Sequence, residues 1–358
     1  SIATYKRFLN NPSAFGTQEY AKAYYHIGYA YFKQKEYTSA LENFRLYLMS
    51  EKSKSPQYLS DAYLRTGDCY LVDKQLEKAI ENYDLAISMK QSNVDYALIK
   101  KAEAYGVLLK FDEKVIVLKQ LLDQFPKSSY YGVTEGELAR TYYQQLGDKK
   151  MALKHYNHLI ETHPRNLPYV RQAMLDIGRI YYDLEEYQQA IKSFKDVVTY
   201  YRATEASRSS LKNLQRLYTE INRPQEYFEY IKSLGIEPSV EEEDSLYYFA
   251  AQDQLLDKGD CEQAMKGFDD YIKRFPTGSF VAKAHYYWAD CLDQSAKYDD
   301  ALSHYIKVAG MPVMAFTLDA YKRIAYISYE KKQDYQRSLE AYRQAYKMST
   351  FKEDRNKS

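Results

Sequence analysis

Residues 24–48 read YYHIGYAYFKQKEYTSALENFRLYL, and this stretch sets a pattern that the rest of the chain repeats. The small residue Gly28 is followed after 12 positions by Ala40, and aromatic rings stand at Tyr31 and Phe44. Spacings of three and four residues place such side chains on one face of a helix. Because Gly28 and Ala40 are small, two helices can approach each other closely. We therefore expect two packed helices joined by a turn.

The same pattern recurs at a period near 37 residues. We call the position of Ala40 the anchor and the position of Gly28 the small slot. The anchors are Ala40, Ala79, Lys114, Ala152, Ala190, Ala264, Ala301 and Ser338. Their steps are 39, 35, 38, 38, 74, 37 and 37 residues, so the step of 74 hides one degenerate unit near Tyr227. Nine units at this period indicate a stacked array of helix pairs.

Composition narrows the class of protein further. The chain has 358 residues, with 50 Lys+Arg against 49 Asp+Glu, and a net charge of +1. This balance gives no bulk attraction to nucleic acid. No apolar run approaches the roughly 18–20 residues of a membrane span. The three cysteines, Cys69, Cys261 and Cys291, form no CxxC pair, which excludes a disulfide framework and a cysteine zinc site.

Helix boundaries agree with the repeat pattern. All nine prolines fall in predicted turns. Eight of them separate one unit from the next, and Pro224 separates the two helices of the degenerate unit. Proline inside a helix costs about 3 kcal/mol, and a wrong assignment of the helices would have placed several prolines inside them. Ser239 followed by Glu242 is a capping box that predicts a helix start.

With these features the repeat resembles the tetratricopeptide repeat, a helix-turn-helix unit of about 34 residues. The resemblance covers nearly the whole chain, although tyrosines such as Tyr24 and Tyr63 stand where that family has Trp. The unit at 204–235 departs furthest, with Gln215 in the small slot and Tyr227 at the anchor. The family implies an all-α, right-handed superhelix of nine repeats plus an N-terminal half repeat.

A second resemblance concerns the loops between units. Phe125-Pro-Lys-Ser-Ser129 and Phe275-Pro-Thr-Gly-Ser279 precede a following helix, and 275–292 read FPTGSFVAKAHYYWADCL. This style is similar to the repeats of bacterial envelope proteins such as the outer-membrane-protein assembly lipoprotein and the Tol-Pal accessory protein. It implies a location in the periplasm or at the outer membrane, with a cytoplasmic location as the alternative.

The domain organisation follows from the degenerate unit. We expect an N-terminal array at 1–203, a degenerate repeat and possible hinge at 204–245, and a C-terminal array at 246–358. One continuous solenoid over 1–358 is the alternative. Because residues 1–9 align with 40–48, the chain starts at a second helix. We therefore expect it to be a piece of a longer or a cleaved protein.

No catalytic motif is present, and we expect neither an enzyme nor a cofactor. The best metal candidate is His155, His158 and Glu161, which we interpret as a solvated helix edge because zinc sites need more donors. We interpret Trp288 as a core residue rather than a sugar platform.

Two further features have alternative interpretations. Cys261 and Cys291 are expected to be small packing residues, although a disulfide in an oxidising compartment is the alternative. The acidic run at 241–244 is explained by the positive end of a helix dipole.

A functional signal is expected on the concave surface, which the first helix of each unit lines. The residue after each small slot, called the inner position, should face inward. These residues are Tyr29, Asp68, Glu103, Arg140, Arg179, Arg216, Asp253, Asp290 and Tyr326. Arginine occupies the inner position in three successive units, which favours a ligand that carries a carboxylate or phosphate group. Neighbouring tyrosines provide contact area for a ligand at low entropic cost. The predicted partner-binding residues are Arg140, Arg179, Arg216, Tyr143, Tyr182, Lys212, Tyr29 and Phe32.

The sequence therefore predicts a non-catalytic scaffold that binds a partner protein or an extended acidic or aromatic peptide along this groove. No inner position is Asn, so the carboxylate clamp of chaperone-binding relatives is not expected. The alternatives are a glycan-handling accessory protein of the envelope and a cytoplasmic regulatory adaptor. The identity of the partner and the oligomeric state stay open.

Overall fold

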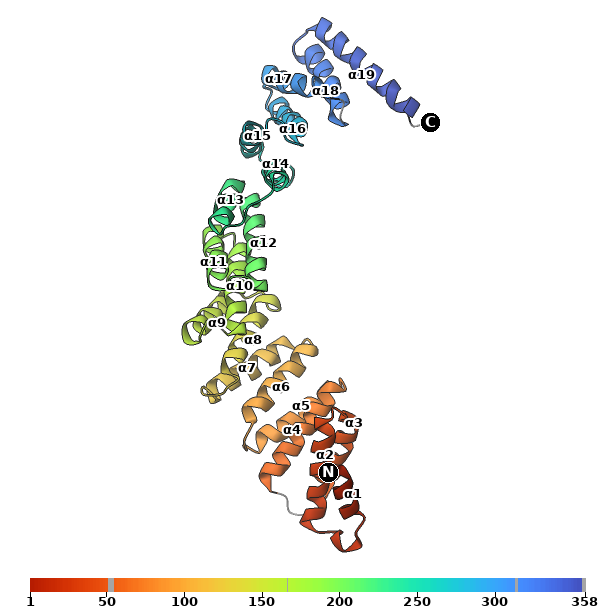
Figure 1. Cartoon of the computed structure of the whole chain (residues 1–358), viewed down its shortest axis with the longest axis vertical. Coiled ribbons are helices and arrows are strands. Elements are labelled where there is room, and N and C mark those ends of the chain that lie inside the picture. The colour runs from red at the N-terminus through yellow and green to blue at the C-terminus, as the bar shows by residue number, and fades with distance from the viewer. Residues whose placement is uncertain (51–54, 166, 313–314, 356–358) are drawn as a thin grey trace. The chain divides into compact units, whose positions relative to one another are not determined.

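The computed structural model describes residues 1–50, 55–165, 167–312 and 315–355. These residues form helices and turns and contain no strand, which confirms the expected all-α fold (Figure 1). After α1 (Ile2–Leu9) and a short 3-10 turn (Pro12–Ala14), the described helices alternate between a first and a second helix of each pair. The repeat map drawn from the sequence is therefore correct through the degenerate unit.

The chain divides into two compact units, Ser1–Ser193 and Phe194–Ser358. The boundary lies inside one helix, α11 (Tyr187–Tyr200). The segment 204–245 lies within the second unit, and its role as a hinge stays a prediction.

In the first unit, each helix pair is followed directly by the next. Its first helices are α2 (Gln18–Lys33), α4 (Pro56–Val72), α6 (Val94–Val107), α8 (Tyr131–Gln144) and α10 (Pro168–Asp183). Its second helices after α1 are α3 (Tyr37–Met49), α5 (Leu76–Ser88), α7 (Phe111–Gln124) and α9 (Lys149–Thr162).

The second unit follows the same order. Its first helices are α12 (Glu205–Glu220), α14 (Val240–Leu256), α16 (Val281–Gln294) and α18 (Ala315–Tyr326), the last continued by a π-helical turn (Ile327–Lys331). Its second helices are α13 (Pro224–Ser233), α15 (Cys261–Arg274), α17 (Tyr298–Ala309) and α19 (Tyr335–Arg355). Pro224 starts α13, and Ser239 and Glu242 form the predicted capping box of α14.

The small positions hold each pair together. The anchors Ala40 and Ala79 are fully buried. A Cβ atom placed on Gly28 would lie 2.9 Å from the ring of Phe44, and one on Gly67 would lie 2.7 Å from the ring of Tyr83. The small slots of these two repeats are therefore occupied by glycine because an aromatic ring of the second helix lies directly against the backbone.

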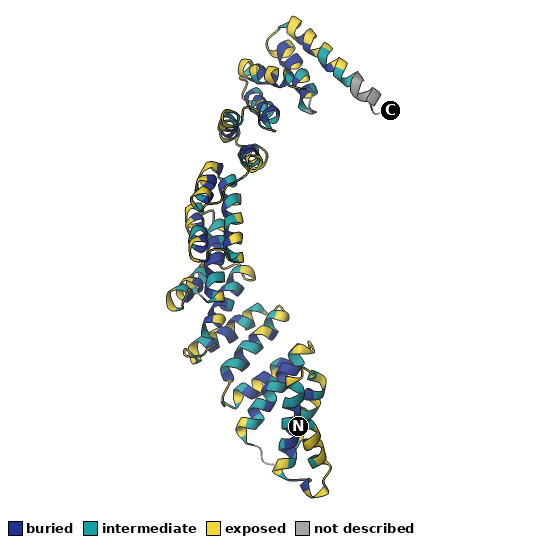
Figure 2. Cartoon of the chain, in the orientation of Figure 1, coloured by how far each residue is buried: buried dark blue, intermediate teal, exposed yellow. Residues whose placement is uncertain are grey.

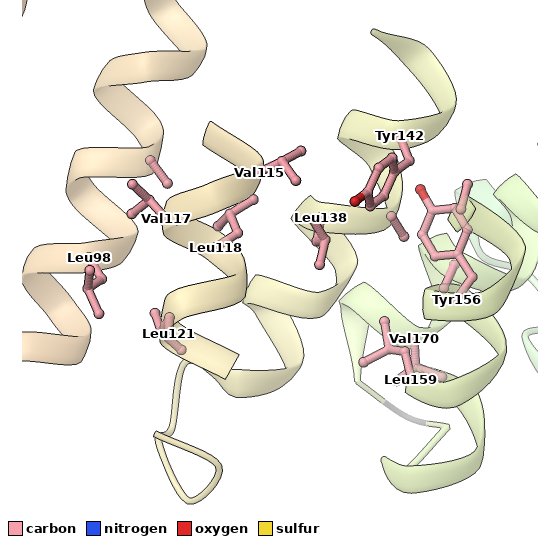
Figure 3. Packing of buried hydrophobic residues seen from close by; sticks show 14 of the residues in the cluster. Leu98, Val115, Val117, Leu118, Leu121, Leu138, Tyr142, Tyr156, Leu159 and Val170 are labelled. Carbon is pink, nitrogen blue, oxygen red and sulfur yellow. The ribbon is translucent and has the colours of Figure 1, made fainter. Parts of the chain in front are cut away.

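Buried residues lie along the helices of both units (Figure 2), and their hydrophobic side chains pack into several core clusters. One cluster of the first unit passes from Leu98 on α6 through Leu118 and Leu138 to Tyr156 and Val170 (Figure 3). Tyrosine is a core residue here, as expected, and in four of the repeats the hydroxyl of a buried tyrosine donates to a nearby carboxylate. The hydroxyls donate to aspartates as follows: Tyr83 to Asp68 at 3.0 Å, Tyr156 to Asp176 at 3.2 Å, Tyr271 to Asp244 at 2.6 Å and Tyr305 to Asp290 at 2.5 Å.

One expectation about the cysteines is wrong. Cys261, at the start of α15, and Cys291, on α16, form a disulfide, and their Cα atoms are 5.5 Å apart. This distance lies within the range of native disulfides. The two residues face each other because the start of a second helix lies beside the end of the following first helix. Cys69 is a buried free thiol.

Candidate functional site

The predicted partner-binding residues occupy four first helices. Tyr29 and Phe32 lie on α2, Arg140 and Tyr143 on α8, and Arg179 and Tyr182 on α10, all in the first unit. Lys212 and Arg216 lie on α12 in the second unit, and both are exposed. The structure therefore divides the predicted arginine block between the two units.

Both predicted arginines of the first unit, Arg140 and Arg179, are paired with a carboxylate on their own helix. The Nη1 atom of Arg140 lies 2.5 Å from Oε1 of Glu137, and that of Arg179 lies 2.9 Å from Oδ1 of Asp176. Both arginine side chains keep about two fifths of their surface exposed, 39% and 40%. They are partly neutralised but accessible to a ligand.

The predicted tyrosines also have local partners. The Tyr143 hydroxyl donates to Oδ2 of Asp183 at 2.7 Å, which links α8 to α10. Burial and this hydrogen bond raise the pKa of Tyr143. The ring of Tyr182 lies 6.2 Å from that of Tyr187 between centroids. These rings therefore help to join neighbouring helices of the array.

Tyr29 and Phe32 belong to a closed cluster that we call the Arg65 network. The guanidinium of Arg65, on α4, lies over the rings of Tyr29, Phe32 and Tyr96 at 5.8, 5.7 and 5.3 Å. It pairs with Oδ2 of Asp68 at 2.7 Å. These cation–π and ionic contacts fill the inner surface between α2 and α6 with the protein's own side chains.

The carboxylates of this network are fully used. Asp61 accepts hydrogen bonds from the hydroxyls of Tyr25 and Tyr29 at 2.7 and 2.6 Å. Asp68 keeps only 7% of its side chain exposed and accepts from Tyr83 as well as Arg65. Burial raises the pKa of Asp68, and Arg65 opposes that shift. The inner position of the second repeat is therefore structural, which sequence reasoning missed because the partner Arg65 lies three residues earlier.

A groove opens one repeat further along, between α6, α7 and α8. It has a volume of about 710 Å³ and includes two inner positions, Glu103 and Arg140. Its apolar lining includes Ile99, Ala102, Val107, Leu109, Phe111, Leu118 and Val133, and its charged lining consists of Lys100, Glu103, Lys114, Glu137 and Arg140. We call this surface the α6–α8 groove.

The charged groups of the groove are paired unequally. Lys100 Nζ lies 2.7 Å from Oε2 of Glu103. Glu137 is shared by two cations, because its Oε2 lies 3.1 Å from Nζ of Lys114 and its Oε1 contacts Arg140. The groove thus holds three cations and two carboxylates.

Two substitutions in the repeat pattern accompany this groove. Lys114 stands at the anchor, where the neighbouring repeats have a buried alanine. Gly106 stands three residues after the inner position, where α2, α4, α8 and α10 carry Phe32, Leu71, Tyr143 and Tyr182. The irregular anchor was visible in the sequence, but its consequence for the surface was not.

The metal candidate has a different environment from the one expected. His155 and His158 both face Glu135 of α8, with Nδ1–Oε1 distances of 3.5 and 2.7 Å, while Glu161 is exposed. Among the described residues, no group of three or more His, Cys, Asp or Glu side chains could hold a metal ion. These histidines therefore act as partners of a buried carboxylate.

The remaining candidates have structural roles in the second unit. Trp288 packs against a core cluster and lies 4.2 Å from His304 between ring centroids. In the acidic run, Glu242 caps α14, Glu243 pairs with Lys232 at 2.6 Å, and Asp244 is buried beside Tyr271. No helix within the described ranges combines the length and the apolar content needed to cross a membrane.

Stacked helix pairs with an open inner groove define a helical-repeat protein. Four stretches match family models of the tetratricopeptide repeat: residues 21–53 and 60–93 match one model, and residues 137–166 and 172–204 match another. No curated protein matches the chain.

Several solved structures are similar to the chain at low identity. A tetratricopeptide repeat protein from Parabacteroides merdae is 17% identical with a TM-score of 0.42, over 74% of this chain and 98% of that one. MamA from Desulfovibrio magneticus is 14% identical with a TM-score of 0.43, over 52% and 97%. YrrB, described as a tetratricopeptide repeat protein with an unusual peptide-binding site, is 14% identical with a TM-score of 0.46, over 59% and 100%.

Proposed function

We propose that the chain is a non-catalytic scaffold that holds an extended segment of a partner protein, with the α6–α8 groove as a principal contact. Tetratricopeptide repeats are generally scaffolds of this kind. The observation that carries the proposal is the groove itself, whose lining combines apolar side chains with charged residues that include Arg140. Such a combination suits a peptide, because apolar burial supplies affinity and ion pairs fix its register. Arg179, in the same unit, is proposed as a further anchor of this partner, and Arg216 is proposed as a separate partner contact of the second unit.

A site-specific photo-cross-linker tests this function. Val133 lines the groove and is 39% exposed, while Ile116 is 65% exposed on α7 and does not line it. We expect a cross-linker at Val133 to capture a defined partner segment in the native cells, with the cross-linked peptides identified by mass spectrometry. The same group at Ile116 should not capture that segment.

Charge reversal provides the second arm of this test. Replacement of Arg140 and Arg179 by Glu should abolish the adduct at Val133. Equal capture at Val133 and Ile116, or capture that survives the charge reversal, would contradict the proposed groove.

We further propose that the protein acts in the bacterial cell envelope. The disulfide between Cys261 and Cys291 supports this location, because such bonds persist in oxidising compartments and are rare in the cytosol. The loop style of residues 275–292 is in keeping with it. The cytoplasmic adaptor is the competing possibility.

Thiol counting separates the two compartments. Cells are lysed in denaturant with an alkylating agent, so that every free thiol is modified. Among the three cysteines of this chain, an envelope protein should show one modified thiol, at Cys69, and two more after reduction, at Cys261 and Cys291. Three modified thiols before reduction would favour the cytoplasmic adaptor.

A further inference from the structure

The α6–α8 groove lies where the repeat pattern omits a large side chain. Tyr143, three residues after the inner position of α8, closes the space to the next first helix by donating to Asp183 on α10. Gly106 holds the same position on α6 and has no side chain to place there. A ring supplied from outside would therefore replace a group that the neighbouring repeat carries itself.

The register of the repeats indicates which ring fits. Asp183 lies four residues after Arg179, and the residue four after Arg140 is Gln144, which lines the groove. The pair formed by Tyr143 on α8 and Asp183 on α10 thus corresponds, one repeat earlier, to Gly106 on α6 and Gln144 on α8. An aromatic ring over Gly106 would direct a phenolic hydroxyl towards this amide, which can accept or donate.

The floor under this position is formed by Lys114. A Cβ atom placed on Gly106 would lie 3.5 Å from Cδ of Lys114, which is ordinary van der Waals contact. Lys114 keeps 15% of its side chain exposed, and its Nζ reaches Glu137. Its methylene stem therefore offers an apolar surface to a ring, and its charge lies at the edge of the same space.

The charge of the groove calls for a carboxylate. Glu137 is the carboxylate partner of both Lys114 and Arg140, so that its single charge balances two cations. A carboxylate brought by a ligand would complete the pairing of Arg140, whose side chain is 39% exposed. Hydrogen bonds between ionised partners are among the strongest in proteins.

We propose that the α6–α8 groove binds a peptide segment that carries an aromatic side chain, preferably tyrosine, beside an acidic residue. The ring lies over Gly106 and Lys114, and the carboxylate pairs with Lys114 and Arg140. The exposed apolar rim, with Val107 at 59% and Leu109 at 72% exposure, covers the peptide backbone on either side. This inference rests on the proposed function and names the chemistry of its partner.

An unbiased peptide selection tests the inference. Random dodecapeptides displayed on phage are selected on the immobilised full chain and counter-selected on Gly106→Tyr, which fills the groove with its own ring. We expect the recovered peptides to be enriched in Tyr or Phe next to Asp or Glu. Aromatic residues dominate the energetics of buried contacts, so replacing that ring by Ala should weaken binding at least about tenfold.

Matched variants assign the effect to named groups. Labelled synthetic copies of the recovered peptides are titrated by fluorescence anisotropy. Gly106→Ala should retain affinity within about twofold, because it leaves the groove open, while Gly106→Tyr should lose about tenfold or more. Lys114→Met should weaken binding of an acidic peptide but not binding of the same peptide with Asp replaced by Asn. The four affinities form a double-mutant cycle.

A second blocking variant guards against misfolding of Gly106→Tyr. Val107→Glu places a like charge on an exposed rim position and should also weaken acidic peptides. If recovered peptides depend on the groove but lack an enriched aromatic or acidic residue, the inference fails and the proposed function stands. If no peptide distinguishes the chain from both blocking variants, the inference and the proposed function fail together.

Discussion

The Arg65 network and the α6–α8 groove are built by neighbouring repeats with the same pattern in the same unit, yet the network is closed and the groove is open. In the network, Arg65 is 18% exposed and lies among three rings. In the groove, Arg140 is 39% exposed and contacts one carboxylate. The difference shows that the repeat fixes the backbone, while a few positions decide whether its inner surface is filled.

The order of charges along the helix separates the two regions. On α4 the cation precedes the carboxylate, as Arg65 and Asp68, whereas on α8 the carboxylate precedes the cation, as Glu137 and Arg140. A carboxylate at the inner position can accept the hydroxyl of the buried tyrosine of its own repeat, as Asp68 accepts from Tyr83. Arginine at that position cannot accept a hydrogen bond, so it stays at the surface.

Alanine at the two arginines should give the largest contrast. Arg65→Ala leaves Asp68 buried without its cation and should destabilise α4 by about 3 kcal/mol. Arg140→Ala should cost less than about 1 kcal/mol, because the pair is exposed and Glu137 keeps Lys114. Amide hydrogen exchange of α4 and α8 measures the free energy of local opening in each region. Equal losses of free energy in the two helices would show that the two ion pairs contribute equally to stability, contrary to this prediction.

A methyl group on Gly67 should give the next largest effect. Its Cβ would lie 2.7 Å from the ring of Tyr83, which is fully buried and hydrogen-bonded to Asp68. Because the ring cannot move freely, Gly67→Ala should destabilise the chain by about 1–3 kcal/mol. Chemical denaturation followed by circular dichroism measures the change. An unchanged stability would mean that the closed region is less tightly packed than its distances indicate.

Much of this architecture could be predicted from the sequence because it depends on local spacing. Glycine and alanine at fixed intervals, prolines between units and the capping box at Ser239 each act within a few residues. The same reasoning located the degenerate unit, where Tyr227 replaces the small anchor and is buried. It also placed Glu103 and Arg140 at corresponding positions, and both line the α6–α8 groove.

The side-chain partners could not be predicted, because they depend on which neighbour a long side chain reaches. Asp68 was expected to face the groove, but Arg65, Tyr83 and Tyr96 occupy its oxygen atoms. Likewise, the pairing of Cys261 with Cys291 was the less favoured alternative, since spacing alone does not fix the distance between two helix ends. The signal that could have revealed the groove was the joint presence of Gly106 and Lys114.

The pH dependence of the Arg65 network should be a smaller effect. Burial raises the pKa of Asp68 above its ordinary value of 3.8, and Arg65 opposes the shift. The folded state therefore keeps this proton to a higher pH than the unfolded chain does. The stability that Asp68 contributes is fully present below pH 3.8 and declines as the pH rises through the folded pKa.

The matched variant Asp68→Asn isolates this titration from those of other carboxyl groups. The difference in free energy of unfolding between the native chain and Asp68→Asn should decrease from pH 3.5 towards pH 7. A difference that increases with pH would show that the ion pair with Arg65, rather than burial, governs this carboxylate. The carboxylate of the Arg65 network would then be governed by its ion pair, as Glu137 is in the α6–α8 groove, despite its low exposure.

The smallest expected effect has the opposite sign and lies in the open region. The atoms nearest to a Cβ on Gly106 would be those of the flexible Lys114 side chain, at 3.5 Å or more. Alanine in a helix interior is favoured over glycine by about 0.5–1 kcal/mol, and Gly106 lies in the last turn of α6, where part of this gain is retained. Gly106→Ala should therefore stabilise the chain slightly in the same denaturation assay in which Gly67→Ala destabilises it. Both changes add one methyl group to a first helix, and the helix gain is smaller at Gly106 than at Gly67. A gain at Gly106 beside a loss at Gly67 would therefore reflect the tighter space around Gly67, and a loss at Gly106 would mean that the groove is already filled.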